Sequence, residues 1–297
     1  MRVLPVWRSL LFVPAHVDRF VERAHLRGAD CVNLDLEDSV PLSEKSGARA
    51  GVAAAAARLR RGRGDVLVRI NAPLSLAVAD VEASVGPHID GLILTKLLGP
   101  DHVKLLDELV SERERVAGLA PGKLLFFGLI ETPEALPLAQ AIAAASPRMV
   151  ALSLGAEDFA TAIGTEPDEE NLLVARQSLL HAARAAGVMP LGLVGSIADF
   201  GDAAAFAAMA RRSARRGYDG ANCINPAQVA ALNAAFTPDE VDVAQARRVI
   251  AADAAGTAAG FGAVALDGRM IDAPIVLRAR RLLDRAAAIA RREAACG

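Results

Sequence analysis

Residues 124–131 read Leu-Leu-Phe-Phe-Gly-Leu-Ile-Glu, an apolar run that ends on a carboxylate. Further short runs rich in Val, Ile, Leu and Phe recur along the chain, separated by Ala-, Arg- and Glu-rich stretches with helical spacing. This alternation predicts βα units around a parallel sheet. We expect strands at residues 9–14, 31–36, 66–71, 91–96, 124–131, 150–155, 189–194 and 221–225. Eight strands with intervening helices predict an α/β fold of the (β/α)8 TIM-barrel type.

A six-stranded open sheet is the alternative architecture, but no Gly-x-Gly-x-x-Gly turn follows the first expected strand. Prolines mark two of the strand-to-helix turns. Pro133 follows Thr132, and Pro226 follows Asn225, so that each proline suits the first position of a helix with a capping residue before it. Both turns support the expected alternation of strands and helices.

The strand pattern stops beyond Phe236. We predict a barrel domain of residues 1–236 and a C-terminal helical extension of residues 237–297. A helix opens at residues 237–240 and runs to about residue 255, and a Gly- and Ala-rich loop leads to a final Arg-rich helix. This loop, with glycines from 256 to 262, would let the extension act as a lid or an oligomer contact.

The charge balance excludes several classes of partner. Lys plus Arg number 33 and Asp plus Glu 35 in 297 residues, so there is no basic field of the kind that favours nucleic acid or an anionic membrane.

Cys31, Cys223 and Cys296 are odd in number and widely spaced, which suits a reducing compartment rather than a disulfide framework. We read no targeting signal and no membrane-spanning run, and we expect a soluble, cytoplasmic protein.

Charged residues close several expected strands, where a buried parallel strand would be apolar. They are Arg69, Lys96, Glu131, the Glu157-Asp158 pair and the cluster at 35–38. The carboxyl ends of barrel strands converge on one face, so these side chains are expected to share a pocket. A structural ring of salt bridges is the alternative. However, Glu37, Glu131 and Asp158 come from three strands and would repel one another without a cation between them.

Hard oxygen ligands without nearby His or Cys favour magnesium, with manganese and calcium as alternatives. We select Glu131 and Asp158 as direct ligands. Glu37 or Asp38 would hold a metal-bound water or orient Arg69. None of the five histidines pairs with a nucleophile motif, so Ser–His hydrolysis has no support.

Five motifs in order resemble those of the citrate lyase β-subunit family, within the HpcH/HpaI aldolase/citrate lyase superfamily. They lie at residues 8–15, 34–41 with Lys45 and Arg49 behind, 68–71, 130–133 and 155–158. The resemblance runs from about residue 8 to residue 275. It implies a magnesium-dependent barrel, usually a homo-oligomer (dimer, trimer or hexamer), that acts on citryl, malyl, citramalyl or related coenzyme A thioesters.

By position, Glu131 and Asp158 match the family's metal ligands, and Arg69 matches its substrate-binding arginine. The residues that match segments contacting the thioester carrier are Phe12, Lys45, Asn225 and Pro226. Asp272 matches an acidic residue that relatives supply to a neighbouring subunit's active site. The sequence departs from the family where Asn225 replaces the usual His and Leu191-Gly192 replace a common Ile-Asp pair, which bears on substrate or carrier preference.

The expected chemistry is a retro-Claisen cleavage to acetyl-CoA and a 2-oxo acid. Arg69 would stabilise the charge that develops on a carboxylate or enolate oxygen, and Asp272 would protonate the enolate carbon. Cations at the barrel mouth would bind the carrier phosphates; the candidates are Lys45, Arg49, Arg8 and Arg19. Solvated helix charges are the alternative for Lys45 and Arg49.

Three rival functions stay open at this point. The first is a free-acid aldolase of the same superfamily, against which the long C-terminal segment argues. The second is a thioesterase for malyl-type thioesters, which would use the same pocket and differ in placing a water. The third is a non-catalytic or carrier-protein-dependent subunit of a larger lyase complex, such as the β-subunit of a citrate lyase, which would work as a binding module.

Overall fold

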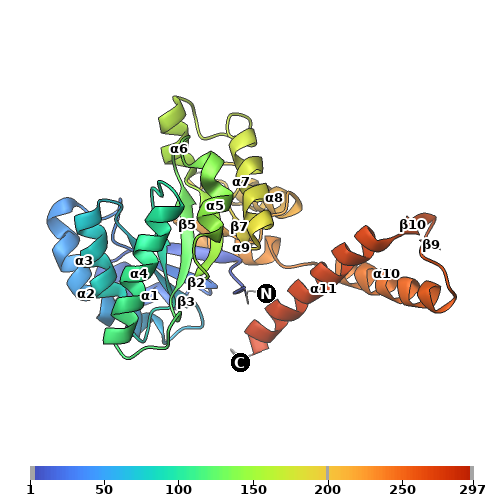
Figure 1. Ribbon diagram of the computed structural model, residues 1–297, viewed down its shortest axis with the longest axis horizontal. Helices are drawn as coiled ribbons and strands as arrows, with labels where there is room; N and C mark the ends of the chain where they lie inside the picture. The colour runs from blue at the N-terminus through green and yellow to red at the C-terminus, as the bar shows by residue number, and fades with distance from the viewer. Residues whose placement is uncertain (1–3, 199–200, 295–297) are drawn as a thin grey trace. The chain divides into compact units, whose positions relative to one another are not determined.

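The computed structural model describes residues 4–198 and 201–294, so Cys296 lies outside the described residues. The chain divides into two compact units, residues 1–236 and 237–297, the second drawn in orange to red in Figure 1. Cys31 and Cys223 are both buried, and Cys31 Sγ donates to Asn33 Oδ1 at 3.3 Å.

The first unit is built on eight parallel strands in the order β7-β6-β5-β4-β3-β2-β1-β8. Their bounds are β1 Ser9–Pro14, β2 Cys31–Asp35, β3 Asp65–Ile70, β4 Gly91–Leu94, β5 Leu125–Ile130, β6 Met149–Leu154, β7 Met189–Leu191 and β8 Ala221–Cys223. A parallel bridge between Leu191 and Gly220 brings β7 beside the start of β8, and the Gly192 amide donates to the Gly220 carbonyl at 2.9 Å. The sheet is thus nearly closed, and the TIM-barrel prediction is confirmed.

Two apolar clusters follow from the alternation of side chains along each strand. One cluster joins Leu10, Leu67, Ile93 and Phe127, which come from different strands and fill the barrel interior. The other contains residues next to them in sequence, such as Leu11, and packs beneath the helices. Both faces of the sheet are therefore buried, which explains the near-continuous apolar runs of the sequence.

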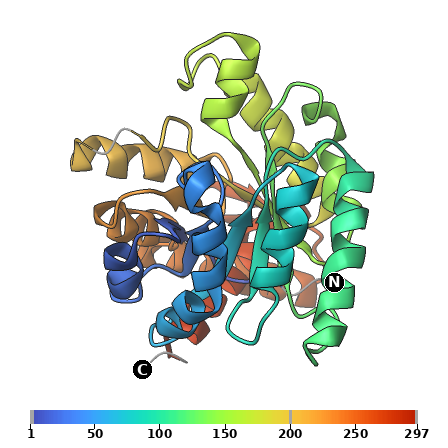
Figure 2. The ribbon, with the colours of Figure 1, turned by 90° about the vertical axis from the view of Figure 1, so that its left-hand side faces the viewer.

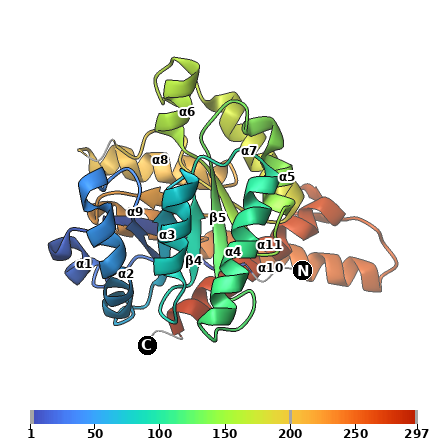
Figure 3. The same cartoon turned by 60° about the vertical axis from the view of Figure 1, so that its left-hand side comes forward.

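Helices surround the sheet on its outer face (Figures 2 and 3). Their bounds are α1 Asp18–Ala24, α2 Lys45–Leu59, α3 Leu74–Ser84, α4 Pro100–Val116, α5 Ala139–Ala144, α6 Ala156–Ile163, α7 Leu173–Ala186, α8 Ala203–Arg215 and α9 Ala227–Ala235, with 3-10 turns at Leu42–Glu44 and Leu136–Leu138. Among the described residues, no helix combines the length and apolar character needed to cross a bilayer.

The two proline turns differ in detail from the prediction. Pro226 directly precedes α9, and the Asn225 side chain accepts from the Ala227 amide at 3.0 Å, so a helix does open there. The prediction for Pro133 was wrong: a turn follows it, and α5 begins only after the 3-10 turn. The Thr132 hydroxyl accepts from the Ala135 amide at 3.3 Å, so it closes that turn instead of capping an α-helix.

The second unit contains α10 Glu240–Ala258 and α11 Ala273–Ala294 with a hairpin between them. The expectation that strands stop beyond Phe236 was wrong, because β9 Val264–Leu266 and β10 Arg269–Ile271 pair antiparallel. Asp267 and Gly268 connect them with φ of 52° and 74°, as a tight hairpin turn requires.

The expected flexible glycine stretch is also shorter than predicted. Gly256 lies inside α10, where a Cβ atom would stand 2.1 Å from Val264 Cγ1. The glycine therefore allows β9 to approach the helix closely, and it does not loosen the chain.

Candidate active site

The carboxyl ends of the strands surround one cavity of about 250 Å³. Phe12, Arg69, Glu131 and Asp158 are among the residues that line it. Apolar side chains such as Leu191 complete the wall. The convergence expected from barrel geometry thus brings charged side chains from β3, β5 and the start of α6 into one concave site.

Arg69 is held by Asp35 on the neighbouring strand. Arg69 Nε lies 2.7 Å from one Asp35 oxygen and Nη2 lies 2.6 Å from the other. Burial opposes ionisation of Asp35, but Arg69, the Ser39 hydroxyl and the Glu37 amide outweigh it and hold the Asp35 pKa below its usual value. The guanidinium also lies over the Phe12 ring, 4.8 Å from its centre. Arg69 is therefore fixed in position at the cavity wall.

Glu37 is shared by two cations. Its carboxylate lies 3.0 Å from Arg69 Nη1 and 2.5 Å from Lys96 Nζ. Burial raises the Glu37 pKa, and the two cations only partly offset this. Glu37 or Asp38 was predicted either to hold a metal-bound water or to orient Arg69. The contacts of Glu37 fit the second of these roles.

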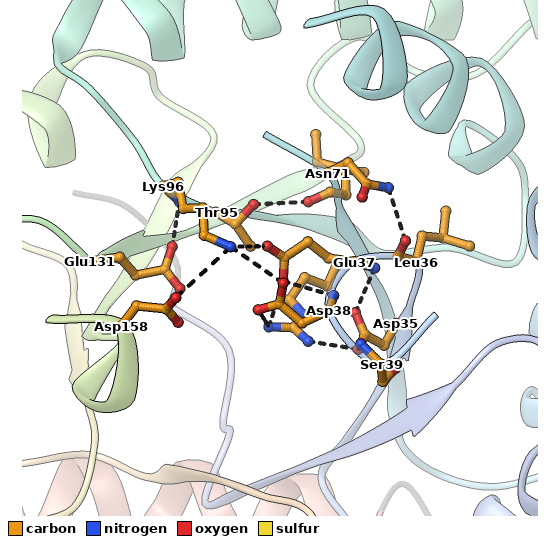
Figure 4. Close-up of polar contacts among 12 residues, drawn as sticks. Asp35, Leu36, Glu37, Asp38, Ser39, Asn71, Thr95, Lys96, Glu131 and Asp158 are labelled. Carbon is orange, nitrogen blue, oxygen red and sulfur yellow. Dashed lines mark hydrogen bonds and ion pairs between the residues drawn. The ribbon is translucent and has the colours of Figure 1, made fainter. Parts of the chain in front are cut away.

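Lys96, a charge at an expected strand end that was not predicted to have a role in the site, lies among the carboxylates of the site (Figure 4). Its ammonium group also lies 3.4 Å from Asp38 and 4.0 Å from Asp158. Burial alone would lower the Lys96 pKa, but the surrounding carboxylates raise it overall, so the group stays charged. The Lys96 ammonium group therefore supplies part of the positive charge that reduces repulsion among these carboxylates.

Glu131 is 2 % exposed and lies where β5 ends. Its carboxylate accepts from the Lys96 backbone amide, and a Cβ atom on Gly155 would stand 2.3 Å from Glu131 Cγ. Only a glycine at 155 leaves room for this side chain. Burial, and then the negative charges of Asp158 and Glu37, raise the Glu131 pKa to about 7.

Glu131 and Asp158 suit a divalent cation that needs few protein ligands. Both line the cavity, they interact electrostatically, and the Asp158 side chain is 43 % exposed. In residues 4–198 and 201–294, no group of three or more His, Cys, Asp or Glu side chains is arranged to hold a metal ion. Magnesium commonly takes one or two carboxylates and completes its shell with substrate and water, so the donor set fits this ion.

The expected phosphate-binding cations are already engaged elsewhere, with one exception. Lys45 Nζ donates to the Leu36 and Glu37 carbonyls at 2.8 and 2.9 Å and so braces the loop after β2. Arg49 pairs with buried Asp80 at 2.6 Å. The alternative, that Lys45 and Arg49 are solvated charges on a helix surface, was therefore wrong for both residues.

Arg8 does not belong to this face of the barrel. It precedes β1, is buried, and pairs with Asp30 before β2, so it lies at the amino ends of the strands. Including Arg8 among the mouth cations was therefore wrong. Arg19 is exposed and lies over the Phe20 ring.

Four predicted positions of the barrel unit are not among the residues that line the cavity: Glu37, Lys45, Asn225 and Pro226. Asn225 and Pro226 lie at the turn between β8 and α9, with the Asn225 amide donating to the Gln228 side chain at 3.0 Å. Asp272 belongs to the second unit, where its carboxylate accepts from the Ile275 amide at 3.4 Å ahead of α11. Gly192, one of the departures from the family pattern, does line the cavity.

Comparisons with known proteins agree with this geometry. The family model described as HpcH/HpaI aldolase/citrate lyase matches residues 8–226. The citrate lyase subunit beta of Haemophilus influenzae is 36% identical and covers 94% of this chain and 96% of its own length. The L-malyl-CoA/beta-methylmalyl-CoA lyase of Cereibacter sphaeroides is 34% identical over 94% of both chains.

A solved structure is similar over nearly the whole chain. It is the protein CitE from Mycobacterium tuberculosis in complex with magnesium, acetoacetate and coenzyme A, with a TM-score of 0.75, 29% identity and coverage of 97% of this chain and 100% of that one. The matches with these relatives span nearly the whole chain, and the solved structure has a similar fold. This chain belongs to the HpcH/HpaI aldolase/citrate lyase family and is a lyase of that family.

Proposed function

We propose that this protein is a magnesium-dependent carbon–carbon lyase that cleaves a 3-hydroxy-acid coenzyme A thioester of the citramalyl, malyl or citryl type. The products are acetyl-CoA and a 2-oxo acid. The observation that carries the proposal is the meeting of Arg69 with Glu131 and Asp158 around one cavity. The malyl-CoA lyase relative and the coenzyme A complex of the structural neighbour support the thioester class.

The reaction breaks the bond between the hydroxyl-bearing carbon and the carbon next to the thioester. The hydroxyl group loses its proton and becomes the carbonyl of the 2-oxo acid. The electron pair of the broken bond passes to the enolate of the acetyl thioester, which then takes up a proton at carbon. One proton leaves the hydroxyl group and one is taken up at carbon, so the cleavage consumes no net proton, and the second step needs an acid on the protein.

Glu131 and Asp158 would hold the metal, while Arg69 would stabilise the developing negative charge. A bound magnesium ion supplies Lewis acidity that lowers the pKa of the substrate hydroxyl and orients the adjacent carboxylate. Arg69 remains protonated, since the carboxylates around it outweigh burial and raise its pKa. Its fixed guanidinium can therefore stabilise an enolate or carboxylate oxygen without reorganising.

Glu37 would serve as the residue that orients Arg69, because it lies within 3.0 Å of the guanidinium. Phe12 supports the same group from the other side through its ring. This assignment gives the predicted Glu37 a positioning role in catalysis.

The acid that protonates the enolate carbon is proposed to be Asp272 from a neighbouring subunit of a homo-oligomer. Asp272 follows the hairpin of the second unit and lies outside the barrel sequence. One of its carboxylate oxygens accepts from the Ile275 backbone amide at 3.4 Å, near the start of α11. Such a bond leaves the second carboxylate oxygen to act in proton transfer.

The coenzyme A carrier would lie across the mouth of the barrel, near Phe12, Lys45 and the Asn225-Pro226 turn. In this proposal Lys45 acts mainly by bracing the loop that carries Glu37, because its ammonium group binds two carbonyls of that loop. Arg19, which is exposed, is the better candidate for a phosphate contact.

A second candidate function is the β-subunit of a multi-subunit citrate lyase complex. The named relative from Haemophilus influenzae, matched over 96% of its length, favours it. A malyl-type thioesterase would use the same cavity with a water as nucleophile. The three functions differ in products and in the need for partner proteins.

The test is to incubate the purified protein with magnesium and citramalyl, malyl and citryl thioesters of coenzyme A. The lyase proposal predicts equal amounts of acetyl-CoA and a 2-oxo acid from at least one substrate. Free coenzyme A with an intact hydroxy acid would identify a thioesterase. Turnover that appears only on adding partner subunits would identify a component of a complex.

A further inference from the structure

Lys96 has a left-handed backbone conformation, which is unusual for a lysine. Its φ is 47°, in the left-handed region, which a residue with a long side chain rarely adopts. Among the described residues, Asp267 is the one other non-glycine residue with positive φ, and it lies in a hairpin turn before Gly268. Lys96 instead lies two residues after the end of β4.

This conformation turns the Lys96 amide toward Glu131. The amide donates to Glu131 Oε2, which fixes one of the two carboxylate oxygens. The close approach of Gly155 to Glu131 Cγ restrains the rest of that side chain. The left-handed backbone therefore sets the direction of the second oxygen, Oε1.

The ammonium group of the same residue reaches the other half of the site (Figure 4). It lies 2.5 Å from Glu37, whose second oxygen lies 3.0 Å from Arg69. It also lies 4.0 Å from Asp158. Lys96 thus connects the proposed metal ligands, Glu131 and Asp158, to Arg69 through Glu37.

We propose that Lys96 is a positioning residue with two separable roles: its left-handed backbone amide orients Glu131, and its ammonium group fixes Glu37, and through it Arg69, relative to Asp158. The inference rests on the proposed function for the meaning of that spacing. It does not place Lys96 in contact with the reacting atoms.

The two roles can be separated by the choice of side chain. Lys96→Gly removes the ammonium group but adopts positive φ without strain, so the amide can still reach Glu131. Lys96→Val also removes the charge, but its β-branched side chain opposes positive φ and turns the amide away. Lys96→Arg keeps the charge. Lys104→Met is the matched control, because Lys104 pairs with Asp101 on an exposed helix surface.

The first measurement is magnesium affinity by titration calorimetry without substrate. We expect Lys96→Gly to bind magnesium about as tightly as the wild type, and Lys96→Val to bind it about 10–100-fold more weakly, the usual effect of losing a partner that orients a ligand. Equal affinities in the Gly and Val variants would overturn the role of the amide.

The second measurement is the division of the loss between kcat and KM. We expect Lys96→Gly to lower kcat about 10–100-fold with little change in KM, and Lys96→Arg to recover part of that loss. An unchanged kcat in Lys96→Gly would overturn the role of the ammonium group. Loss of the fold in Lys96→Gly would assign the residue to stability and overturn the proposal as well.

These outcomes are distinct from failure of the proposed function. A wild-type protein that neither binds magnesium nor cleaves any thioester would contradict the lyase proposal itself. A wild-type protein that does both, with Gly and Val variants that behave alike, would contradict the positioning roles alone.

Discussion

Asp35 and Arg69 are register partners on neighbouring strands and are joined by two hydrogen bonds of 2.7 and 2.6 Å. Because both residues come from the carboxyl ends of parallel strands, the pairing is set by the sheet itself. The rigid orientation of Arg69 is therefore a property of the fold.

Arg69→Lys keeps the positive charge but loses the planar group that binds Asp35 through two nitrogens. We expect kcat/KM to fall by about 100-fold while the protein stays folded. The control is Arg184→Lys, because Arg184 makes a similar two-nitrogen pair with Asp219 on the surface at 2.8 and 2.9 Å. Equal, small effects of the two substitutions on steady-state kinetics would show that Arg69 has a structural role only.

Magnesium affinity should depend on pH through Glu131. The pKa of Glu131 is raised to about 7, so below pH 7 the protonated carboxyl group competes with the metal. We expect affinity to weaken up to about tenfold for each pH unit below 7 and to level off above 8. Calorimetry at pH 6, 7 and 8 measures this, and a profile that is flat across that range would contradict the assignment of Glu131 as a ligand.

The same raised pKa predicts a pH effect on stability without metal. The folded protein holds the Glu131 proton more tightly than the unfolded chain does, so this group's contribution is fully present below about pH 4.5 and is lost as pH rises through 7. Glu131→Gln, which cannot ionise, should remove that part of the pH dependence. The readout is the melting temperature in chelator between pH 5 and 8, compared between the two proteins.

Gly155→Ala should damage the site although it adds a single methyl group. The new Cβ atom would stand 2.3 Å from Glu131 Cγ, so the glutamate must move. We expect magnesium affinity to fall by about 10–100-fold. The control is Gly51→Ala, since Gly51 lies in α2 and no atom lies within 4 Å of its added Cβ; that change should leave magnesium binding intact.

Asp272 is tested by mixing inactive variants. If Asp272 acts on a neighbouring subunit, Asp272→Ala and Arg69→Ala should each be inactive, and co-refolded hybrids should regain part of the activity. The gain arises because some sites then combine an intact Arg69 with the partner chain's intact Asp272. Hybrids that assemble without any regain, or a fully active monomer, would show that the active site is not shared.

The strands could be predicted from the sequence because each is buried on both faces. The predicted strand at residues 9–14 matches β1 at both ends, and the strand predicted at 91–96 ends two residues early, because Thr95 and Lys96 turn out of the sheet. The short hairpin of the second unit was missed, although Asp267-Gly268 is a strong turn signal. Its strands have three residues each, too few to show an alternating pattern.

The site was predictable in its residue types but not in its pairing. Arg69 and Glu131 could be predicted as site residues from the sequence alone, because each is a charged residue at the end of a buried strand. Which charges meet depends on strand order and side-chain length, so the position of the Lys96 ammonium group between Glu37 and Asp158 could not be read from spacing. The positive φ of Lys96 had no sequence signal at all, since no glycine or asparagine stands there.

We propose that Glu131 and Asp158 together hold the metal on which carbon–carbon cleavage depends. The most direct measurement compares acetyl-CoA release by the wild type and by the Glu131→Ala/Asp158→Ala double variant, in chelator and after magnesium is restored. We expect that chelation abolishes wild-type activity, that magnesium restores it, and that the folded double variant stays inactive in both conditions. Full activity of the double variant would contradict the assignment of Glu131 and Asp158 as the metal ligands.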